Sequence, residues 1–157
     1  MNSKKIHKTV ILSAPLKTIW WKWTTHEGLK TFFGVDNRIE LALVGPYEIF
    51  FLLDARAGAQ GGEGNQVLSF LPEQMLTFSW NAPPTIPEIR NHHHKTWVVL
   101  QFKAIGNEQT ELVLDHLGWL DGEKWNETFA YFDNAWDMVL KSLSDTCIDQ
   151  PGQVQSI

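Results

Sequence analysis

The sequence predicts an α+β fold in which antiparallel strands pack against one long C-terminal helix. The first observation is residues 123–147, where apolar residues recur every three or four positions, as in a helix with one buried face. The second is a period of two in the middle of the chain, where short segments alternate between apolar and polar residues. Because strands joined by short turns usually pair in opposite directions, the sheet should be antiparallel.

The N-terminal part of the chain predicts one strand followed by two short helices. Residues 4–12 alternate imperfectly and form the strand. Pro15 suits the first position of a helix, because a proline there loses no internal hydrogen bond. The buried face of this helix should carry the apolar residues spaced three and four apart, Leu16, Ile19, Trp20 and Trp23. Thr24 and Glu27 match a capping box that opens the second helix, and Gly34 is placed to end it.

Strand patterns fill the middle of the chain. Residues 39–43 form one apolar row, and 47–53 form another with Tyr47, Ile49, Phe51 and Leu53 on one side. Four glycines within 58–64 predict a surface loop. No Lys-Ser/Thr pair or helix pattern follows this loop, as a phosphate-binding loop would require. Four further strands are predicted at 67–71, 76–80, 97–104 and 111–117.

The segment 123–147 predicts the long C-terminal helix. Its buried stripe comprises Trp125, Phe129, Phe132, Trp136, Val139, Leu140, Leu143 and Cys147. Asp121 is the expected N-cap, and Pro151 with Gly152 should close the helix. A helix about 37 Å long needs a broad apolar partner surface. The inward rows of the later strands should supply it, namely Leu76, Phe78, Trp80, Val98, Leu100, Phe102, Leu112, Leu114 and His116.

Composition limits the class of protein. The 157 residues, 43% hydrophobic and 20% charged, predict one globular domain over 1–157, with a core at about 5–147 and a C-terminal tail at 148–157. The net charge of −5 and the lack of a basic block argue against a nucleic-acid partner. The only cysteine, Cys147, should simply pack in the core. No apolar run is long enough for a signal sequence or membrane span, so we expect a cytoplasmic protein without membrane contact.

Three packing motifs carry a resemblance to a known family. They are Gly64-x-x-Val67-Leu68-x-x-x-Pro72-x-x-x-Leu76-x-Phe78-x-Trp80; Leu114-Asp115-His116-x-Gly118-Trp119 with Tyr131-Phe132-Asp133-x-x-Trp136-x-x-x-Leu140; and Ala14-Pro15-x-x-x-Ile19-Trp20 with Phe32-Phe33-Gly34. Over about residues 5–146 the chain resembles the SRPBCC (START/Bet v 1-like) superfamily. Within it, the similarity is to the family related to the C-terminal domain of the activator of the heat-shock-protein-90 ATPase. None of these motifs is catalytic, so they speak for fold more than for activity.

The resemblance implies a helix-grip fold, in which a curved antiparallel sheet of about six to seven strands wraps the long helix, with two short helices after the first strand. In such proteins the sheet and helix enclose a cavity that often takes an apolar ligand. The expected ligand-binding residues are Phe51, Phe78, Trp80, Leu100, Leu114, His116, Phe132 and Trp136. The alternative is that eight Trp and nine Phe simply fill the space, because each aromatic ring occupies a large volume.

Two groups of histidines are candidates for chemistry. His116 is the one titratable residue on an apolar inward row, so it either orients a ligand, acts as an acid or base, or is hydrogen-bonded within the core. In an extended run of three histidines only His92 and His94 share a side, so we predict a surface loop rather than a metal site. Prolines nearby make the segment 82–94 a candidate lid over the cavity. No cofactor and no catalytic residues are predicted.

Three functions are compatible with these patterns. The first is a non-enzymatic protein that binds a small apolar or amphipathic molecule between sheet and helix. The second is a protein-interaction module that contacts a chaperone or a second copy of itself, for which Tyr131 and Met138 on the polar flank of the helix are candidate contacts. The third is a cyclase or hydrolase on the same fold, which His116 alone supports weakly.

Overall fold

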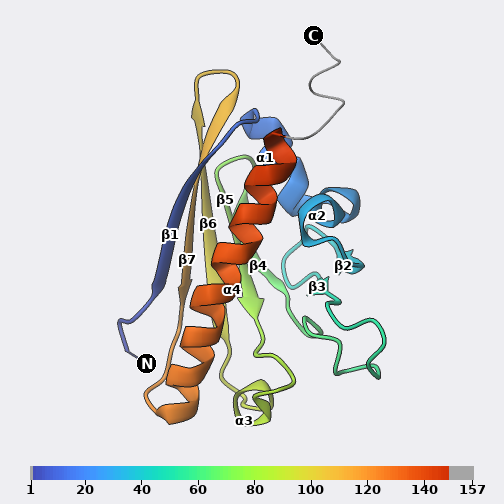
Figure 1. Cartoon of the computed structure of the whole chain (residues 1–157), viewed down its shortest axis with the longest axis vertical. Coiled ribbons are helices and arrows are strands. Elements are labelled where there is room, and N and C mark those ends of the chain that lie inside the picture. Colours follow the sequence, from blue (N-terminus) through green and yellow to red (C-terminus); the bar gives the residue numbers. More distant parts are fainter. Residues whose placement is uncertain (1, 149–157) are drawn as a thin grey trace.

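The computed structural model describes residues 2–148 as seven strands and four helices (Figure 1). In chain order these are β1 (Ile6–Leu12), α1 (Leu16–Thr24), α2 (His26–Phe33), β2 (Asn37–Ile39), β3 (Tyr47–Ile49), β4 (Val67–Leu71), β5 (Met75–Trp80), α3 (Pro87–Arg90), β6 (Thr96–Ile105), β7 (Gln109–Leu117) and α4 (Glu123–Ile148). The predicted α+β helix-grip fold is confirmed, but the curved sheet has five strands instead of the six to seven expected, because β2 and β3 pair only with each other.

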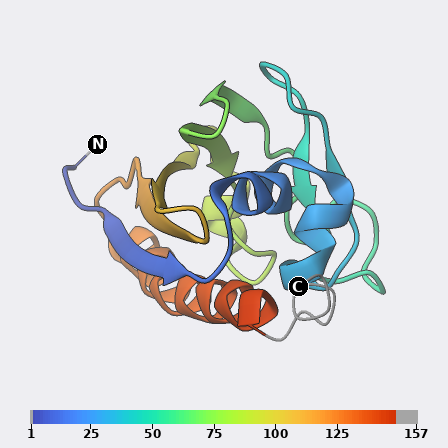
Figure 2. The ribbon, with the colours of Figure 1, turned by 90° about the horizontal axis from the view of Figure 1, so that it is seen from above.

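Five strands form the main antiparallel sheet, in the order β1-β7-β6-β5-β4. The pairs Ile6–His116, His116–Val98, Val98–Phe78 and Phe78–Val67 make one row across the sheet, and all five side chains are buried. Seen from above, the sheet curves from β1 beside α4 towards β4 on the opposite side (Figure 2). The short strands β2 and β3 form a separate two-stranded sheet instead of extending the main one.

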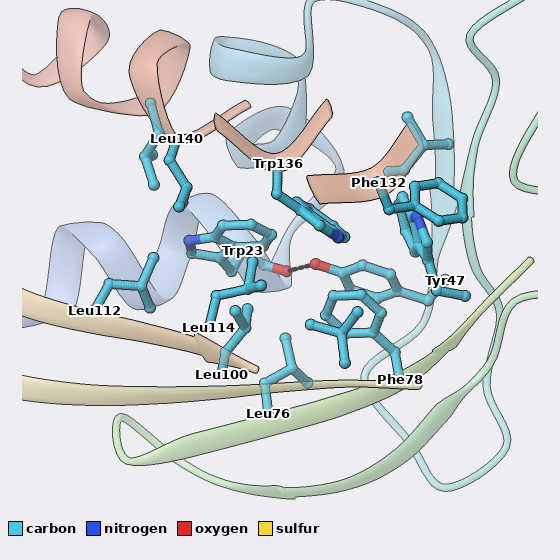
Figure 3. Packing of buried hydrophobic residues seen from close by; sticks show 14 of the residues in the cluster. Trp23, Tyr47, Leu76, Phe78, Leu100, Leu112, Leu114, Phe132, Trp136 and Leu140 are labelled. Carbon is cyan, nitrogen blue, oxygen red and sulfur yellow. Dashed lines mark hydrogen bonds between the residues drawn. The ribbon is translucent and has the colours of Figure 1, made fainter. Parts of the chain in front are cut away.

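The helix α4 lies across the sheet with its predicted apolar stripe inward. Trp125, Phe132, Trp136, Leu140, Leu143 and Cys147 are buried, and Phe129 and Val139 pack against them. Trp136 points from α4 into the core towards Tyr47 (Figure 3). The predicted end of the helix at Pro151 and Gly152 lies outside the described residues. Within residues 2–148, no helix has the length and apolar character needed to cross a bilayer.

The expected caps at three helix starts are each displaced by one residue. Pro15 occupies the N-cap position of α1 instead of the first helical position. Thr25 caps α2, because its hydroxyl accepts a hydrogen bond from the Gly28 N–H, whereas Thr24 ends α1. At α4 the Gly122 carbonyl accepts the first helical bond, from Asn126, so Gly122 takes the N-cap place predicted for Asp121. Gly34 ends α2 in the left-handed conformation, as predicted.

The predicted apolar row of residues 47–53 is wrong beyond Ile49. Tyr47 and Ile49 are fully buried, but β3 ends there, and the side chains of Phe51 and Leu53 are 41% and 55% exposed. The chain continues as an irregular hairpin, in which the Leu52 N–H donates to the Gln60 carbonyl at 2.9 Å. In the row 39–43, Leu43 is also exposed. The alternation of apolar residues therefore continues along the chain beyond the end of the strand.

Truncating the central tryptophan of α4 should destabilise the protein strongly. Trp136 is 1% exposed and packs on Trp80 with ring centroids 5.0 Å apart, so Trp136→Ala leaves a large cavity. We expect a loss of about 3–5 kcal/mol in the free energy of unfolding, measured by urea titration. The control is Trp21→Ala, which removes a side chain that is 41% exposed and should change stability by under about 1 kcal/mol. Equal losses in the two variants would show that the buried face of α4 is wrongly assigned.

Candidate functional site

A pocket of about 270 Å³ opens where the β3–β4 segment, the β5–α3 segment and the middle of α4 meet. Its lining residues are Phe51, Leu52, Gly61, Gly62, Asn65, Trp80, Asn81, Pro83, Pro84, Thr85, Tyr131 and Phe132. Three predicted ligand-binding residues, Phe51, Trp80 and Phe132, are brought together here. The other five lie in the core and are not part of this lining: Phe78, Leu100, Leu114, His116 and Trp136.

Aromatic rings form much of the apolar wall. Trp80 comes from the end of β5 and packs on Trp136 beneath it, which fixes its ring. Phe51 stands edge-on to Trp80 at 6.4 Å and to Phe33 at 5.8 Å. Phe132 is 6% exposed, on the face of α4 that points to the sheet. Aromatic side chains in a lining suit contact with another ring system.

Two glycines let the chain pass close to these rings. A Cβ on Gly61 would lie 2.7 Å from Cδ2 of Phe51, and the Gly61 φ of +130° is unfavourable for other residues. A Cβ on Gly62 would lie 2.7 Å from both the backbone nitrogen and the carbonyl oxygen of Ile49. At Gly61 and Gly62, one wall of the pocket therefore consists of backbone atoms in close contact with β3 and Phe51.

A carboxylate from the same loop, that of Glu63, holds this glycine-rich wall in place. The Glu63 carboxylate accepts hydrogen bonds from the backbone N–H groups of Gly58, Gln60 and Gly61. Burial raises the pKa of Glu63, but these backbone hydrogen bonds outweigh it and leave the pKa below its ordinary value. The N–H groups that could cradle a phosphate in such a loop are thus occupied by a side chain of the same loop.

Arg90, from α3, pairs with Glu63, and we call these two residues together the clamp. Its guanidinium is 9% exposed and lies 3.1 Å from the Glu63 carboxylate. It also donates to the carbonyl oxygens of Gly58 at 2.8 Å, Gly61 at 2.6 Å and Ala82 at 2.6 Å. Because Gly61 belongs to one wall and Ala82 precedes the proline wall, one buried arginine connects both sides of the pocket.

Asn65 contributes a buried amide to the lining. The side chain is 2% exposed, and its Oδ1 accepts a hydrogen bond from the Asn81 backbone N–H at 2.8 Å. Its Nδ2 has no hydrogen-bond partner among the described residues. Behind it, the Asn81 Oδ1 accepts from the Lys95 ammonium at 3.1 Å. Burial, followed by the nearby charge of Arg90, lowers the pKa of Lys95.

His116 is held as a neutral hydrogen-bonding group in the core. The Trp136 indole N–H donates to its Nδ1 at 3.0 Å, so the imidazole hydrogen lies on Nε2 and points to the Thr96 hydroxyl at 2.7 Å. Thr96 in turn donates to the Trp80 carbonyl. Burial lowers the pKa of His116 from 6.5 to about 3. Both ring nitrogens are engaged, which favours the core role over acid–base chemistry.

The histidine run lies away from this pocket. The His94 Nε2–H donates to the Gly118 carbonyl at 2.6 Å, and the His92 Nδ1 accepts from the His94 backbone N–H at 3.0 Å. His92 and His94 also stand edge-on to the ring of Trp125. Within the part of the chain that the structure describes, no group of three or more His, Cys, Asp or Glu residues could hold a metal ion.

Sequence reasoning missed the polar part of the site. Glu63, Asn65 and Arg90 were not singled out, although they shape the pocket through contacts across 16 to 32 residues of sequence. Two features of the sequence could have indicated this part of the site. Asn65 comes directly after the glycine-rich loop, and Pro83 and Pro84 lie in the segment predicted as a lid. That segment does border the pocket, through its two prolines and Thr85.

The buried imidazole should make stability depend on pH. The folded-state pKa of His116, about 3, lies below the ordinary 6.5, so the unfolded chain binds a proton first as the pH falls. Stability is therefore lost as the pH drops from 6.5 towards 3. We expect the wild type to lose about 3 kcal/mol more than His116→Gln between pH 7 and pH 4, measured by urea unfolding at each pH.

Glutamine keeps one acceptor and one donor at this position, so the variant tests protonation rather than loss of the hydrogen bonds. The control His93→Gln changes an exposed ring and should follow the wild-type pH profile. Parallel profiles for all three proteins would contradict the assignment of His116 as a buried neutral base.

Comparison with known proteins gives the chain a family. The model of the family described as "Activator of Hsp90 ATPase homolog 1-like protein" matches residues 13–147. A comparison with curated protein sequences finds no match.

Several solved structures share the fold. Protein MLL2253 from Mesorhizobium loti is 15% identical with a TM-score of 0.71, over 94% of this chain and 98% of that one. The Aha1 dimer from Colwellia psychrerythraea is 23% identical with a TM-score of 0.65, over 95% and 99%. PFC0360w, an HSP90 activator from Plasmodium falciparum, is 16% identical with a TM-score of 0.64, over 84% and 86%.

At these identities the structures establish the fold alone, whereas the family model spans most of the chain. That extent agrees with the helix-grip architecture and with the packing motifs of α4 and the sheet. The chain therefore belongs to the family of Activator of Hsp90 ATPase homolog 1-like proteins.

Proposed function

We propose that this chain is a cytoplasmic, non-enzymatic protein that binds a small apolar or amphipathic molecule in the pocket beside Trp80. The observation that carries the proposal is the lining, which combines aromatic and proline side chains with a few polar groups. Ligand sites are typically concave and mostly apolar, with a small number of polar groups that orient the ligand. Of the predicted ligand-binding residues, Phe51, Trp80 and Phe132 are the contacts that we carry forward.

The dimensions of the pocket limit the ligand. A volume of about 270 Å³ is slightly below the roughly 300–1,000 Å³ typical of sites for drug-sized molecules, so a ligand of about two fused rings fits best. Among residues 2–148, those that line the pocket include no carboxylate, imidazole, thiol or amine. Apart from the phenol of Tyr131, the lining therefore supplies shape and hydrogen bonds, and it holds no pair of groups that could act together as acid and base, which favours binding over catalysis.

A neutral fluorescent dye tests this site directly. We expect N-phenyl-1-naphthylamine to bind with a blue-shifted emission, and Phe51→Ala or Tyr131→Ala to weaken binding about tenfold, because each removes a ring from the lining. Two matched controls should bind like the wild type: Leu53→Ala on the same loop and Met138→Ala on the same helix, neither of which lines the pocket. Binding that is absent, or equal in all five proteins, would refute the proposal.

A second candidate function is contact with a chaperone or with another copy of the chain. It draws on the family description and on two similar structures, an HSP90 activator from Plasmodium falciparum and an Aha1 dimer from Colwellia psychrerythraea. Tyr131 and Met138 supply an exposed apolar strip on α4, at 47% and 67% exposure. A role in the stress response belongs to this candidate.

Hsp90 from the same organism separates the two candidates. An interaction module should raise the ATPase rate of the chaperone, and Met138→Glu should abolish most of that increase by placing a charge in the contact. Phe51→Ala should leave it unchanged, because Phe51 belongs to the pocket instead. Sedimentation velocity of the isolated chain and of Met138→Glu tests self-association in the same way. No stimulation and a monomeric chain would remove this candidate.

A further inference from the structure

Three consecutive large apolar residues are exposed on the loop that follows β3. Phe51, Leu52 and Leu53 are 41%, 50% and 55% exposed. An exposed apolar run of this length is unfavourable in water, so it usually marks a surface that another molecule covers. A ligand in the pocket would touch Phe51 and Leu52 but not Leu53, which is outside the lining. Ligand binding therefore accounts for only part of this surface.

Hydrogen bonds within the loop hold the backbone that carries these side chains. The Ala55 N–H donates to the Leu52 carbonyl at 2.9 Å, and the Leu52 N–H donates to the Gln60 carbonyl at 2.9 Å. The side-chain amide of Gln60 donates to the carbonyl oxygens of Leu53 at 3.3 Å and Ala55 at 3.1 Å. Because the loop is already ordered, a partner that covers the two leucines loses little conformational entropy on binding.

Two opposite charges follow the apolar run. Asp54 and Arg56 are both exposed, and neither forms an ion pair with any of residues 2–148. Between them lies Ala55, whose short side chain lets a second molecule approach closely. Such a surface is complementary to a copy of itself, because a two-fold axis through its centre places each charge of one copy opposite the other charge of its partner.

Other occupants match this chemistry less well. An anionic bilayer is recognised by several Lys or Arg residues, whereas residues 50–60 contain one Arg and one Asp, and the whole chain has a net charge of −5. A strongly acidic or basic peptide would match one of the two loop charges and repel the other. The balanced pair beside an apolar run therefore favours a second copy of this chain.

We propose that this loop is the contact of a symmetric homodimer, in which Leu52 and Leu53 of the two copies pack together and Asp54 of each copy pairs with the partner's Arg56. Few residues take part, so the contact belongs to the weak class of protein interfaces, with a Kd on the order of 100 μM. The dimer borders the pocket, but it does not depend on the proposed binding function.

Reversal of the loop charges tests the pairing directly. Arg56→Asp gives a loop with two acidic groups and Asp54→Arg a loop with two basic groups, so each variant repels a copy of itself. We expect either variant alone to raise the Kd of dimerisation at least about tenfold, measured by sedimentation velocity from about 10 μM to 1 mM protein. An equimolar mixture of the two variants should dimerise about as tightly as the wild type, a recovery that a damaged fold cannot produce.

Three further variants separate this contact from the other surfaces. Leu53→Ala changes a residue outside the pocket lining, so it should weaken dimerisation about tenfold and leave dye binding to dilute protein unchanged. Tyr131→Ala should do the reverse, because Tyr131 lines the pocket and lies on α4. Met138→Glu, also on α4, should leave the dimer unchanged.

Each outcome decides between the proposals. A wild type that stays monomeric up to about 1 mM refutes the dimer and leaves the proposed binding function standing. A dimer that survives both charge reversals, or one lost only in Met138→Glu, shows that the contact lies elsewhere. A charge-dependent dimer without dye binding refutes the proposed function alone. If either reversal fails to fold, amide shifts of residues 51–56 on dilution of the wild type decide the question, and their absence overturns the inference.

Discussion

The hydrogen bond from the Trp136 indole to the buried His116 imidazole is the constraint on which the arrangement of helix and sheet depends. Apolar contacts alone would allow α4 to rotate or slide, because they have little directionality. The bond at 3.0 Å fixes both the rotation and the axial position of the helix against β7. Thr96 extends the link to β6 and β5, through His116 on one side and the Trp80 carbonyl on the other. A polar chain thus specifies one packing among many apolar alternatives.

The position of the pocket follows from this link. Phe132 lies four residues before Trp136 on the same face of α4, so the turn that anchors the helix also sets the ring at the pocket. Trp80, which contacts Trp136, is fixed from the same point. Deeper in the core, Tyr47 stacks on Phe78 with centroids 4.2 Å apart, and its hydroxyl donates to the Trp23 carbonyl at 2.7 Å (Figure 3). These rings belong to the buried core, whereas the pocket lies where the β3–β4 segment, the β5–α3 segment and α4 meet.

Elements with a regular period could be predicted from the sequence, because helix and strand patterns are local. The stripe of α4 and the inward rows of β5, β6 and β7 are examples, and both are confirmed. The outer rim of the fold was less predictable. Phe51 continues the alternation of β3 but leaves the strand, because its ring packs on Gly61, ten residues away. The pairing of Glu63 with Arg90 leaves no sequence pattern at all, since the partners come from a loop and a one-turn helix.

The clamp around Arg90 separates the frame of the pocket from its surface. Arg90 and Glu63 hold backbone atoms of both walls, while the side chains that face the pocket take no part in those bonds. Residues such as Leu52, Pro84 and Thr85 can therefore be exchanged without loosening the frame that carries them. Related chains can therefore change ligand specificity by substituting lining side chains while the backbone frame stays the same. For the same reason, protein engineers could redesign the lining of this pocket one side chain at a time.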